Sequence, residues 1–202
     1  LRVTLAGVFS ENFVAPCLIS MAKKYPHLTI EANFNSSVVN LIQEKFDVAI
    51  RIGQLKDSSL KTQKLGSREE YFVASPKYLK EVPLSKPEDL HQANCLGEDT
   101  TWTFKRNAKS FSLELTGNFK CNNPRVIHKA VLDGLGVAKL PAAYVHEDLK
   151  KGRLISVLEP FRESSKDIWF ITPSKIRLNP NAEFFYQELK TCIKKPTNGS
   201  IL

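Results

Sequence analysis

The sequence lacks the patterns that mark catalysis, metal binding or membrane insertion. Its four histidines are isolated, and its four cysteines form no C-x-x-C motif, so metal-ligand spacing is absent. There is no G-x-G-x-x-G loop, no Walker motif and no G-x-S-x-G nucleophile elbow. No apolar run approaches the roughly 20 residues of a membrane-spanning helix. We therefore expect no catalytic residue, no metal, no cofactor and no membrane contact.

Individual cysteine, histidine and acidic residues are more simply explained by structural roles than by catalysis. Cys17, Cys95, Cys121 and Cys192 are expected to be small buried hydrophobes, with a redox pair as the alternative. The histidines are interpreted as surface or capping residues. The acidic neighbours at 69–70, 98–99 and 147–148 lie on segments that read as solvated, and a catalytic pair would have to converge on one cleft. The cysteine usage fits a reducing, cytoplasmic location.

Charge and length bound the possible partners. The chain has 202 residues and a formal net charge of +8, and 42% of its residues are hydrophobic. Its basic residues are scattered and not clustered with aromatics, which favours a solvated surface over a nucleic-acid interface. The start, 1–6, is too short and too alternating for a signal peptide. Since it has no initiator Met, we expect a piece of a longer protein.

The first 55 residues are organised around the apolar run from Phe46 to Gly53, which predicts a strand buried on both faces. Alternating segments at 1–6 and 27–34 predict two more strands. Helices are predicted from about 13 to 25, after a turn at 7–12, and from Ser37 to Lys45. The loop Gln54–Leu60 follows. This β-α-β-α-β order predicts a parallel sheet flanked by helices.

The remainder reads as a second α/β region whose last helix returns to the first. Strands are predicted at 70–75, at 102–104 and 110–116 as an antiparallel pair, and at 136–140, 153–158 and 166–172. Asn122-Asn123-Pro124 opens a helix that Gly134 ends, and further helices are predicted at 141–151 and after Asn179-Pro180. Prolines 76, 83 and 87 punctuate short helical turns.

Small polar residues recur where a strand is followed by a predicted helix. They lie at 7–12, at Asn35-Ser36-Ser37 and at Asn122-Asn123. A helix N-terminus offers unpaired N–H groups and the positive end of the helix dipole, which together suit a carboxylate or other anion. For any single end, simple capping is the favoured explanation of these residues. Three such ends in one chain favour a ligand site.

Six ordered blocks of sequence resemble the effector-binding domain of LysR-type transcriptional regulators. The most specific are Asp47-Val48-Ala49-Ile50-Arg51-Ile52-Gly53 and Asp57-Ser58-Ser59-Leu60. Others are Val73-Ala74-Ser75-Pro76, Trp102-Thr103-Phe104, Gly134-Leu135-Gly136-Val137-Ala138 and 149–154. The likeness extends over nearly the whole chain. The sequence departs from the family pattern at Leu5-Ala6-Gly7 and at Asn35-Ser36-Ser37. In this family these loops determine which effector binds.

The resemblance implies an α/β fold of two Rossmann-like subdomains joined by two crossover strands, like a periplasmic binding protein. Residues 1–70 plus 171–202 would form subdomain I and residues 71–170 subdomain II. A winged helix-turn-helix that binds DNA would precede Leu1. A small-molecule effector would bind in the cleft, and the chain would act as a homodimer or homotetramer. Carried over by position, the ligand-binding residues would be Gly7, Val8, Ser10, Asn35, Ser36, Ile52, Gly53, Trp102, Asn122 and Asn123.

Three rival functions remain at this point. A transport-type solute-binding protein shares the fold but needs an export signal. An enzyme would need a nucleophile, base or metal constellation. A DNA-binding module in its own right would show salt-dependent binding to duplex DNA. The sequence names neither the effector nor the target promoter.

Overall fold

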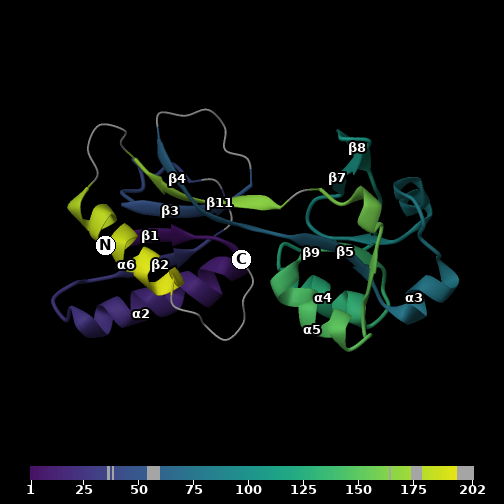
Figure 1. Ribbon diagram of the computed structural model, residues 1–202, viewed down its shortest axis with the longest axis horizontal. Helices are drawn as coiled ribbons and strands as arrows, with labels where there is room; N and C mark the ends of the chain where they lie inside the picture. Colours follow the sequence, from purple (N-terminus) through teal and green to yellow (C-terminus); the bar gives the residue numbers. More distant parts are fainter. Residues whose placement is uncertain (36, 38, 54–59, 164, 174–178, 195–202) are drawn as a thin grey trace. The chain divides into compact units, whose positions relative to one another are not determined.

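The computed structural model describes residues 1–35, 37, 39–53, 60–163, 165–173 and 179–194. By its internal contacts the chain divides into two compact units, one of Leu1–Arg68 with Lys166–Leu202 and one of Glu69–Ser165. The chain therefore passes between the units twice. Each unit has its own sheet with helices against it (Figure 1). The predicted α/β class with two Rossmann-like, periplasmic-binding-protein-like subdomains is confirmed.

The first unit is built on a five-stranded sheet with the order β2-β1-β3-β11-β4. Its strands are β1 (Arg2–Leu5), β2 (Glu31–Phe34), β3 (Val48–Ile52), β4 (Lys61–Arg68) and β11 (Lys166–Thr172). β1 pairs in parallel with both β2 and β3, whereas β11 runs antiparallel to β3 and β4. The carboxyl ends of the three parallel strands therefore share one edge of the sheet. In open α/β sheets this is the edge at which ligands bind.

Helices cover one face of this sheet. They are α1 (Gly7–Phe9), the π-helical turn η1 (Ser10–Val14), α2 (Ala15–Lys24) and α6 (Pro180–Lys194). α2 lies below the strands in Figure 1, and α6, in yellow, packs against it. Their buried side chains, such as Cys17 and Phe185, pack against Val3, Val48 and Phe170 of the sheet. The Phe46–Gly53 run thus becomes the buried strand that its composition predicts, trimmed at both ends.

The turn predicted at 7–12 is wrong, because helical structure begins at Gly7. The π-helical turn explains how a helix can run into Pro16. The N–H of Ala15 donates to the Ser10 carbonyl, five residues back. Proline has no N–H, so it breaks the regular i→i−4 pattern wherever it falls inside a helix. The widened turn directly before Pro16 absorbs this irregularity.

The helix predicted from Ser37 to Lys45 is also wrong. The Asn35 side chain accepts a hydrogen bond from Ser37 N, and the Asn40 side chain accepts from Ile42 N and Gln43 N. Asparagine side chains that bond nearby amides in this way compete with a regular helix. What forms is a single turn over 41–45, ended by Lys45 with a φ of 57°.

β4 has no predicted counterpart. Its sequence, KTQKLGSR, contains one large apolar residue, so no apolar alternation marks it. The strand lies at the edge of the sheet and pairs along its length with β11. This strand is therefore formed by backbone hydrogen bonds to β11, and the pattern of its side chains does not predict it. The predicted loop before it falls, except for Leu60, outside the described residues.

The second unit contains a four-stranded sheet, β10-β5-β9-β6, and a separate hairpin. The sheet strands are β5 (Glu70–Ala74), β6 (Cys95–Leu96), β9 (Val137–Pro141) and β10 (Ile155–Val157). The hairpin pairs β7 (Thr101–Arg106) with β8 (Lys109–Glu114), which confirms the predicted antiparallel pair. The helical elements are α3 (Pro76–Glu81), α4 (Pro124–Leu132), α5 (Ala142–Lys150), η2 (Pro87–Gln92) and η3 (Glu159–Phe161).

Both faces of this sheet are covered. On one face α4 and α5 pack Ile127, Val131 and Val145 against the strands, and they lie side by side in Figure 1. Phe72 faces the other cluster, where it stacks on Phe104 of the hairpin with ring centroids 4.8 Å apart. The predicted helix after Asn122-Asn123-Pro124 is confirmed as α4.

Two expectations about ionisable residues change in this unit. Asp148 is only 4% exposed, so placing residues 147–148 on a solvated segment is wrong for Asp148. It follows Val145 by about one helical turn and shares the buried face of α5. There it meets His128 of α4, whose Nε2 lies 2.8 Å from the carboxylate, so this histidine is neither a surface nor a capping residue. Cys17 and Cys95 are buried as expected, whereas Cys121 and Cys192 are half-buried.

Candidate functional site

The candidate site is the edge of the first sheet at which β1, β2 and β3 end. Leu5 of β1 is the register partner of Phe34 of β2. The chain stays paired just beyond, where Asn35 N donates to the Leu5 carbonyl over 2.9 Å. The loops that begin at Ala6 and at Asn35 therefore leave the sheet as neighbours. β3 joins them from the other side of β1, as its parallel register with β1 requires.

Gly7 is the point of closest approach in this group. Its φ of +74° is one that side chains other than glycine's rarely adopt. A Cβ at this position would lie 3.0 Å from Cδ1 of Ile52 and 3.4 Å from a guanidinium nitrogen of Arg68. The structure thus brings Gly7, Ile52 and Arg68 together. Only a glycine leaves the backbone free to pass this close to them.

The other predicted residues of this unit have internal partners. Val8 and Ser10 are buried, and the Ser10 hydroxyl donates to the Ala6 carbonyl at 2.9 Å. The Gly53 N–H donates to the Asp167 carbonyl, and its own carbonyl accepts from the Trp169 indole. These three residues shape the edge and offer little to a ligand directly.

Asn35 and Ser36 belong to the second of the three loops. The Asn35 side-chain oxygen accepts from Ser37 N at 2.9 Å, so it closes a local turn. No helix begins among the described residues 35, 37 and 39–40, which removes one of the three helix N-termini that the sequence predicts. Ser36 lies outside the described residues.

Arg51 is a member of this site that sequence reasoning missed, although it lies in the most specific block. Its guanidinium donates to Thr4 Oγ1 at 2.8 Å and to the Ile50 carbonyl at 3.0 Å. A longer bond of 3.4 Å reaches the Ser37 carbonyl. The side chain therefore links β3, β1 and the loop after β2.

The charge of Arg51 is not balanced by any residue that the structure describes. All three of its partners are neutral oxygens, and none of its contacts with described residues is to a carboxylate. Burial lowers the pKa of Arg51, which is the direction expected when a cation loses water without gaining an anion. Desolvating a charge in this way is costly unless it is paired. A half-buried guanidinium at this sheet edge can supply charge-assisted hydrogen bonds to an anion.

In the second unit, the predicted residues lie on two separate elements. Trp102 is 4% exposed, its indole N–H donates to the Asp99 carbonyl, and its ring packs 5.6 Å from that of Phe72. It is part of the hydrophobic core. Asn123 caps α4, since its side chain accepts from Arg125 N at 3.0 Å, and Asn122 is exposed beside it.

The described residues hold neither a metal-binding cluster nor a membrane-spanning helix. No group of three or more His, Cys, Asp or Glu side chains gathers there in a way that could hold a metal ion. None of the described helices combines the length and the apolar character needed to cross a bilayer.

Comparison with curated proteins finds transcriptional regulators. An uncharacterized HTH-type transcriptional regulator of Haemophilus influenzae is 30% identical over 184 residues, which cover 88% of this chain and 64% of the relative. The HTH-type transcriptional regulator PtxR of Pseudomonas aeruginosa is 28% identical over 196 residues, covering 94% and 63%. The chain thus spans less than two thirds of the length of these relatives.

Comparison with solved structures points the same way. The regulatory domain of AphB in Vibrio vulnificus matches with a TM-score of 0.80 and 26% identity, over 95% of this chain and 98% of that one. The full-length Vibrio cholerae virulence activator AphB, a member of the LTTR protein family, matches with a TM-score of 0.80 and 25% identity, over 94% and 67%. The sequence profile of the LysR substrate binding domain matches residues 1–192. The chain therefore belongs to the LysR substrate binding domain family and is the effector-binding domain of a LysR-type transcriptional regulator.

Proposed function

We propose that this domain binds a small organic anion and thereby controls transcription by the full-length regulator. The observation that carries the choice of an anion is the half-buried guanidinium of Arg51, whose partners within the described ranges are neutral oxygens. It lies at the sheet edge where Gly7, Asn35 and Ile52 also gather. An anionic group at this edge would supply the countercharge that the described residues do not.

The proposed ligand contacts fall into two sets. In the first unit they are Gly7, Asn35, Ser36 and Ile52, with Val8, Ser10 and Gly53 holding the loops in shape. In the second unit they are Trp102, Asn122 and Asn123. Asn122 is exposed, whereas the Asn123 side chain caps its own helix and Trp102 is buried in the core.

For the full-length protein we propose a cytoplasmic homodimer or homotetramer that binds DNA through an N-terminal winged helix-turn-helix. Two large apolar side chains of the first unit support an oligomer, Ile19 on α2 with 58% exposure and Phe34 on the edge strand β2 with 51%. Sedimentation velocity on this chain tests the proposal, and a monomer at all concentrations would contradict it. The relatives favour this interpretation over a transport-type solute-binding protein.

Thermal-shift screening of small organic acids against this chain tests the effector proposal. A ligand present at about 100 times its Kd adds about 2.7 kcal/mol to the stability of the state that it binds, so its melting temperature rises. Ser36→Glu adds a carboxylate to the loop that follows Asn35, and we expect it to abolish this rise by like-charge repulsion while leaving the unliganded melting temperature unchanged.

Ser20→Glu is the matched control, since Ser20 is an exposed residue of α2 in the same unit. This variant carries the same added charge and should respond to the acid as the unmodified chain does. An undiminished rise in Ser36→Glu would remove this loop from the site. A screen in which only cations or neutral compounds raise the melting temperature would contradict the choice of an anion.

A further inference from the structure

The first unit carries two cysteines on helices that pack against each other. Cys17 lies near the start of α2 and Cys192 near the end of α6. Cys17 belongs to the hydrophobic cluster of this unit, and Cys192 packs against that cluster. Cys17 is 1% exposed, whereas Cys192 is half-buried. The redox pair that the sequence leaves as an alternative therefore has two definite candidates in the fold.

The contacts between α2 and α6 place these two cysteines at the same level. Tyr25, directly after α2, meets Phe184 of α6 edge to face, with ring centroids 4.9 Å apart, and its hydroxyl donates to Glu188 over 2.9 Å. The end of α2 thus contacts the early part of α6, so the two helices run antiparallel. Cys17 lies eight residues before Tyr25, and Cys192 lies eight residues after Phe184. Each span corresponds to about 12 Å along a helix, so the cysteines lie opposite each other.

The two thiols also lie on the faces by which the helices pack. Cys17 and Met21 are four residues apart on α2 and are each 1% exposed. Glu188 and Cys192 are four residues apart on α6. Residues with this spacing form one ridge of a helix, and such ridges interdigitate where two helices meet. Burial raises the pKa of Cys17, and the Cys192 thiol beside it raises that pKa further, so the two thiols are neighbours.

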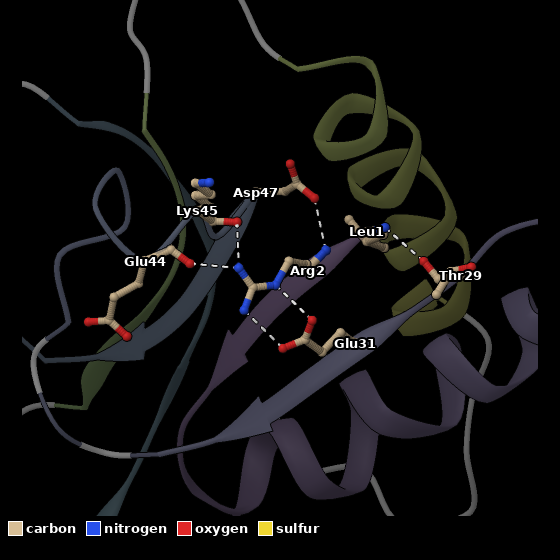
Figure 2. A network of polar contacts seen from close by, with 7 residues as sticks. All are labelled: Leu1, Arg2, Thr29, Glu31, Glu44, Lys45 and Asp47. Atoms are coloured by element: carbon tan, nitrogen blue, oxygen red, sulfur yellow. Dashed lines mark hydrogen bonds and ion pairs between the residues drawn. The ribbon is translucent and has the colours of Figure 1, made fainter.

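Polar contacts attach α6 to the unit at its amino end and in its middle. Asn179, the residue before α6, donates a side-chain hydrogen bond to the Asp47 carboxylate. The same carboxylate accepts from Arg2 N over 2.8 Å, within the network at the start of β1 that Figure 2 shows. Further along α6, Glu188 is bound to the end of α2. Cys192 lies about one turn beyond Glu188, so a covalent bond to α2 at this position would secure the last turn of α6.

We infer that Cys17 and Cys192 form a redox-modification site, at which hydrogen peroxide converts the two thiols into a reversible disulfide. Cys192, the more exposed thiol, attacks the peroxide, so the O–O bond breaks, one water leaves and a sulfenic acid forms on Cys192. The Cys17 sulfur then attacks the sulfenic sulfur, the S–O bond breaks and the disulfide forms. The departing hydroxide takes the Cys17 proton and leaves as a second water. The two thiols together lose two electrons, which reduce one peroxide.

The burial of the two thiols suits these separate roles. A thiol that is buried among apolar side chains stays protonated and is protected from an oxidant in solution, as Cys17 is. A disulfide in a reducing cytoplasm is transient, so this one would form under oxidative conditions and be reduced again by cellular thiols. The site uses none of the residues proposed for the effector. It would therefore stand even if the sheet edge at Gly7 bound nothing.

Peptide mapping after treatment of this chain with hydrogen peroxide tests the inference. Trypsin, which cleaves after lysine and arginine, releases the two cysteines on separate peptides, 3–23 and 191–194. We expect mass spectrometry without reductant to find these two peptides linked, and dithiothreitol to separate them. The oxidised chain should also melt about 5 °C higher than the reduced chain, because the bond closes a long loop of the unfolded chain.

Three variants separate the roles of the thiols. In Cys17→Ala the sulfenic acid on Cys192 has no partner, so dimedone, which traps sulfenic acids, should label Cys192 more strongly than in the unmodified chain. Cys192→Ser should give neither the linked peptides nor the rise in melting temperature. Cys121→Ser is the matched control, because Cys121 is also half-buried but lies in the second unit. This variant should form the linked peptides as the unmodified chain does.

The inference is overturned if peroxide yields no link between peptides 3–23 and 191–194, if Cys121→Ser abolishes the link, or if dithiothreitol does not reverse it. Melting curves of the reduced variants show whether each is folded. Cys192→Ser changes a half-buried position, so it keeps the test decisive if the buried substitution Cys17→Ala prevents folding.

Discussion

The two units of this protein differ in how the charge of a buried or half-buried side chain is compensated. In the second unit, Asp148 is 4% exposed and is held between two basic side chains, His128 and Arg153. In the first unit, the half-buried guanidinium of Arg51 contacts only neutral oxygens among the residues that the structure describes. A compensated buried charge locks two helices together and has no capacity left for a ligand. An uncompensated buried charge lowers the stability of the folded state, and a bound anion would restore that stability.

The largest effect that would sharpen this comparison is expected at Asp148. Asp148→Ala leaves His128 and Arg153 without their shared partner and removes the hydrogen bond that links α4 to α5. We expect the free energy of unfolding to fall by about 3 kcal/mol, as for other buried pairs that lose one member. Urea denaturation measures this loss. A change below about 1 kcal/mol would show that the charge of Asp148 is not the support that its burial indicates.

The control compares the pH dependence of the unfolding free energy in the unmodified chain and in Asp148→Asn, which cannot ionise at this position. Burial acts to raise the pKa of Asp148, but the hydrogen bonds from Arg153 and His128 outweigh it and keep the pKa below its ordinary value. A lowered folded pKa means that the stabilisation is present above the unfolded pKa of about 3.9 and disappears as the pH falls through the folded pKa. The stability gap between the unmodified chain and Asp148→Asn should therefore narrow as the pH falls below about 4.

A medium effect is expected at Arg51, with Arg2 as the comparison. Arg51→Met loses the hydrogen bonds to Thr4 and Ile50 but also relieves a desolvated charge, so we expect a loss of about 1 kcal/mol in unfolding free energy. The same variant should lose the thermal response to the organic acid. Arg2→Met removes a solvated ion pair with Glu31 and should keep that response in full. Equal responses in both variants would break the contrast between the two arginines.

The smallest effect is expected at Lys45 and has the opposite sign. Lys45→Gly relieves the positive φ of 57° at the end of the 41–45 turn. We expect the unfolding free energy to rise by about 1 kcal/mol, the usual cost of a side chain in the left-handed region. The same urea titrations measure it. A destabilised Lys45→Gly would mean that the lysine side chain itself supports the fold.

Predictions from the sequence succeeded where local chemistry is decisive. Asn123 and Pro124 mark the start of α4 because an asparagine cap and a proline in the first turn suit a helix beginning under almost any tertiary arrangement. The run around Val48 and Ile50 predicts a buried strand because it is β-branched and apolar over its length. The sequence-based predictions failed at β4, which is mostly polar and is formed by hydrogen bonding to its neighbouring strand. They also failed at 37–45, where the side chains of Asn35 and Asn40 bond nearby backbone amides in place of a regular helix.

By itself, the sequence determined the α/β class, the family and the short segments from which a site could be built, because composition, periodicity and capping act over a few residues. Only the tertiary structure decided which ionisable groups carry an unbalanced charge. Local sequence does not show that Asp148 pairs with basic side chains while Arg51 has only neutral partners among the described residues, since His128 lies 20 residues before Asp148 and Thr4 lies 47 residues before Arg51. Burial and pairing across such separations depend on how strands and helices pack, and local residue patterns do not encode that.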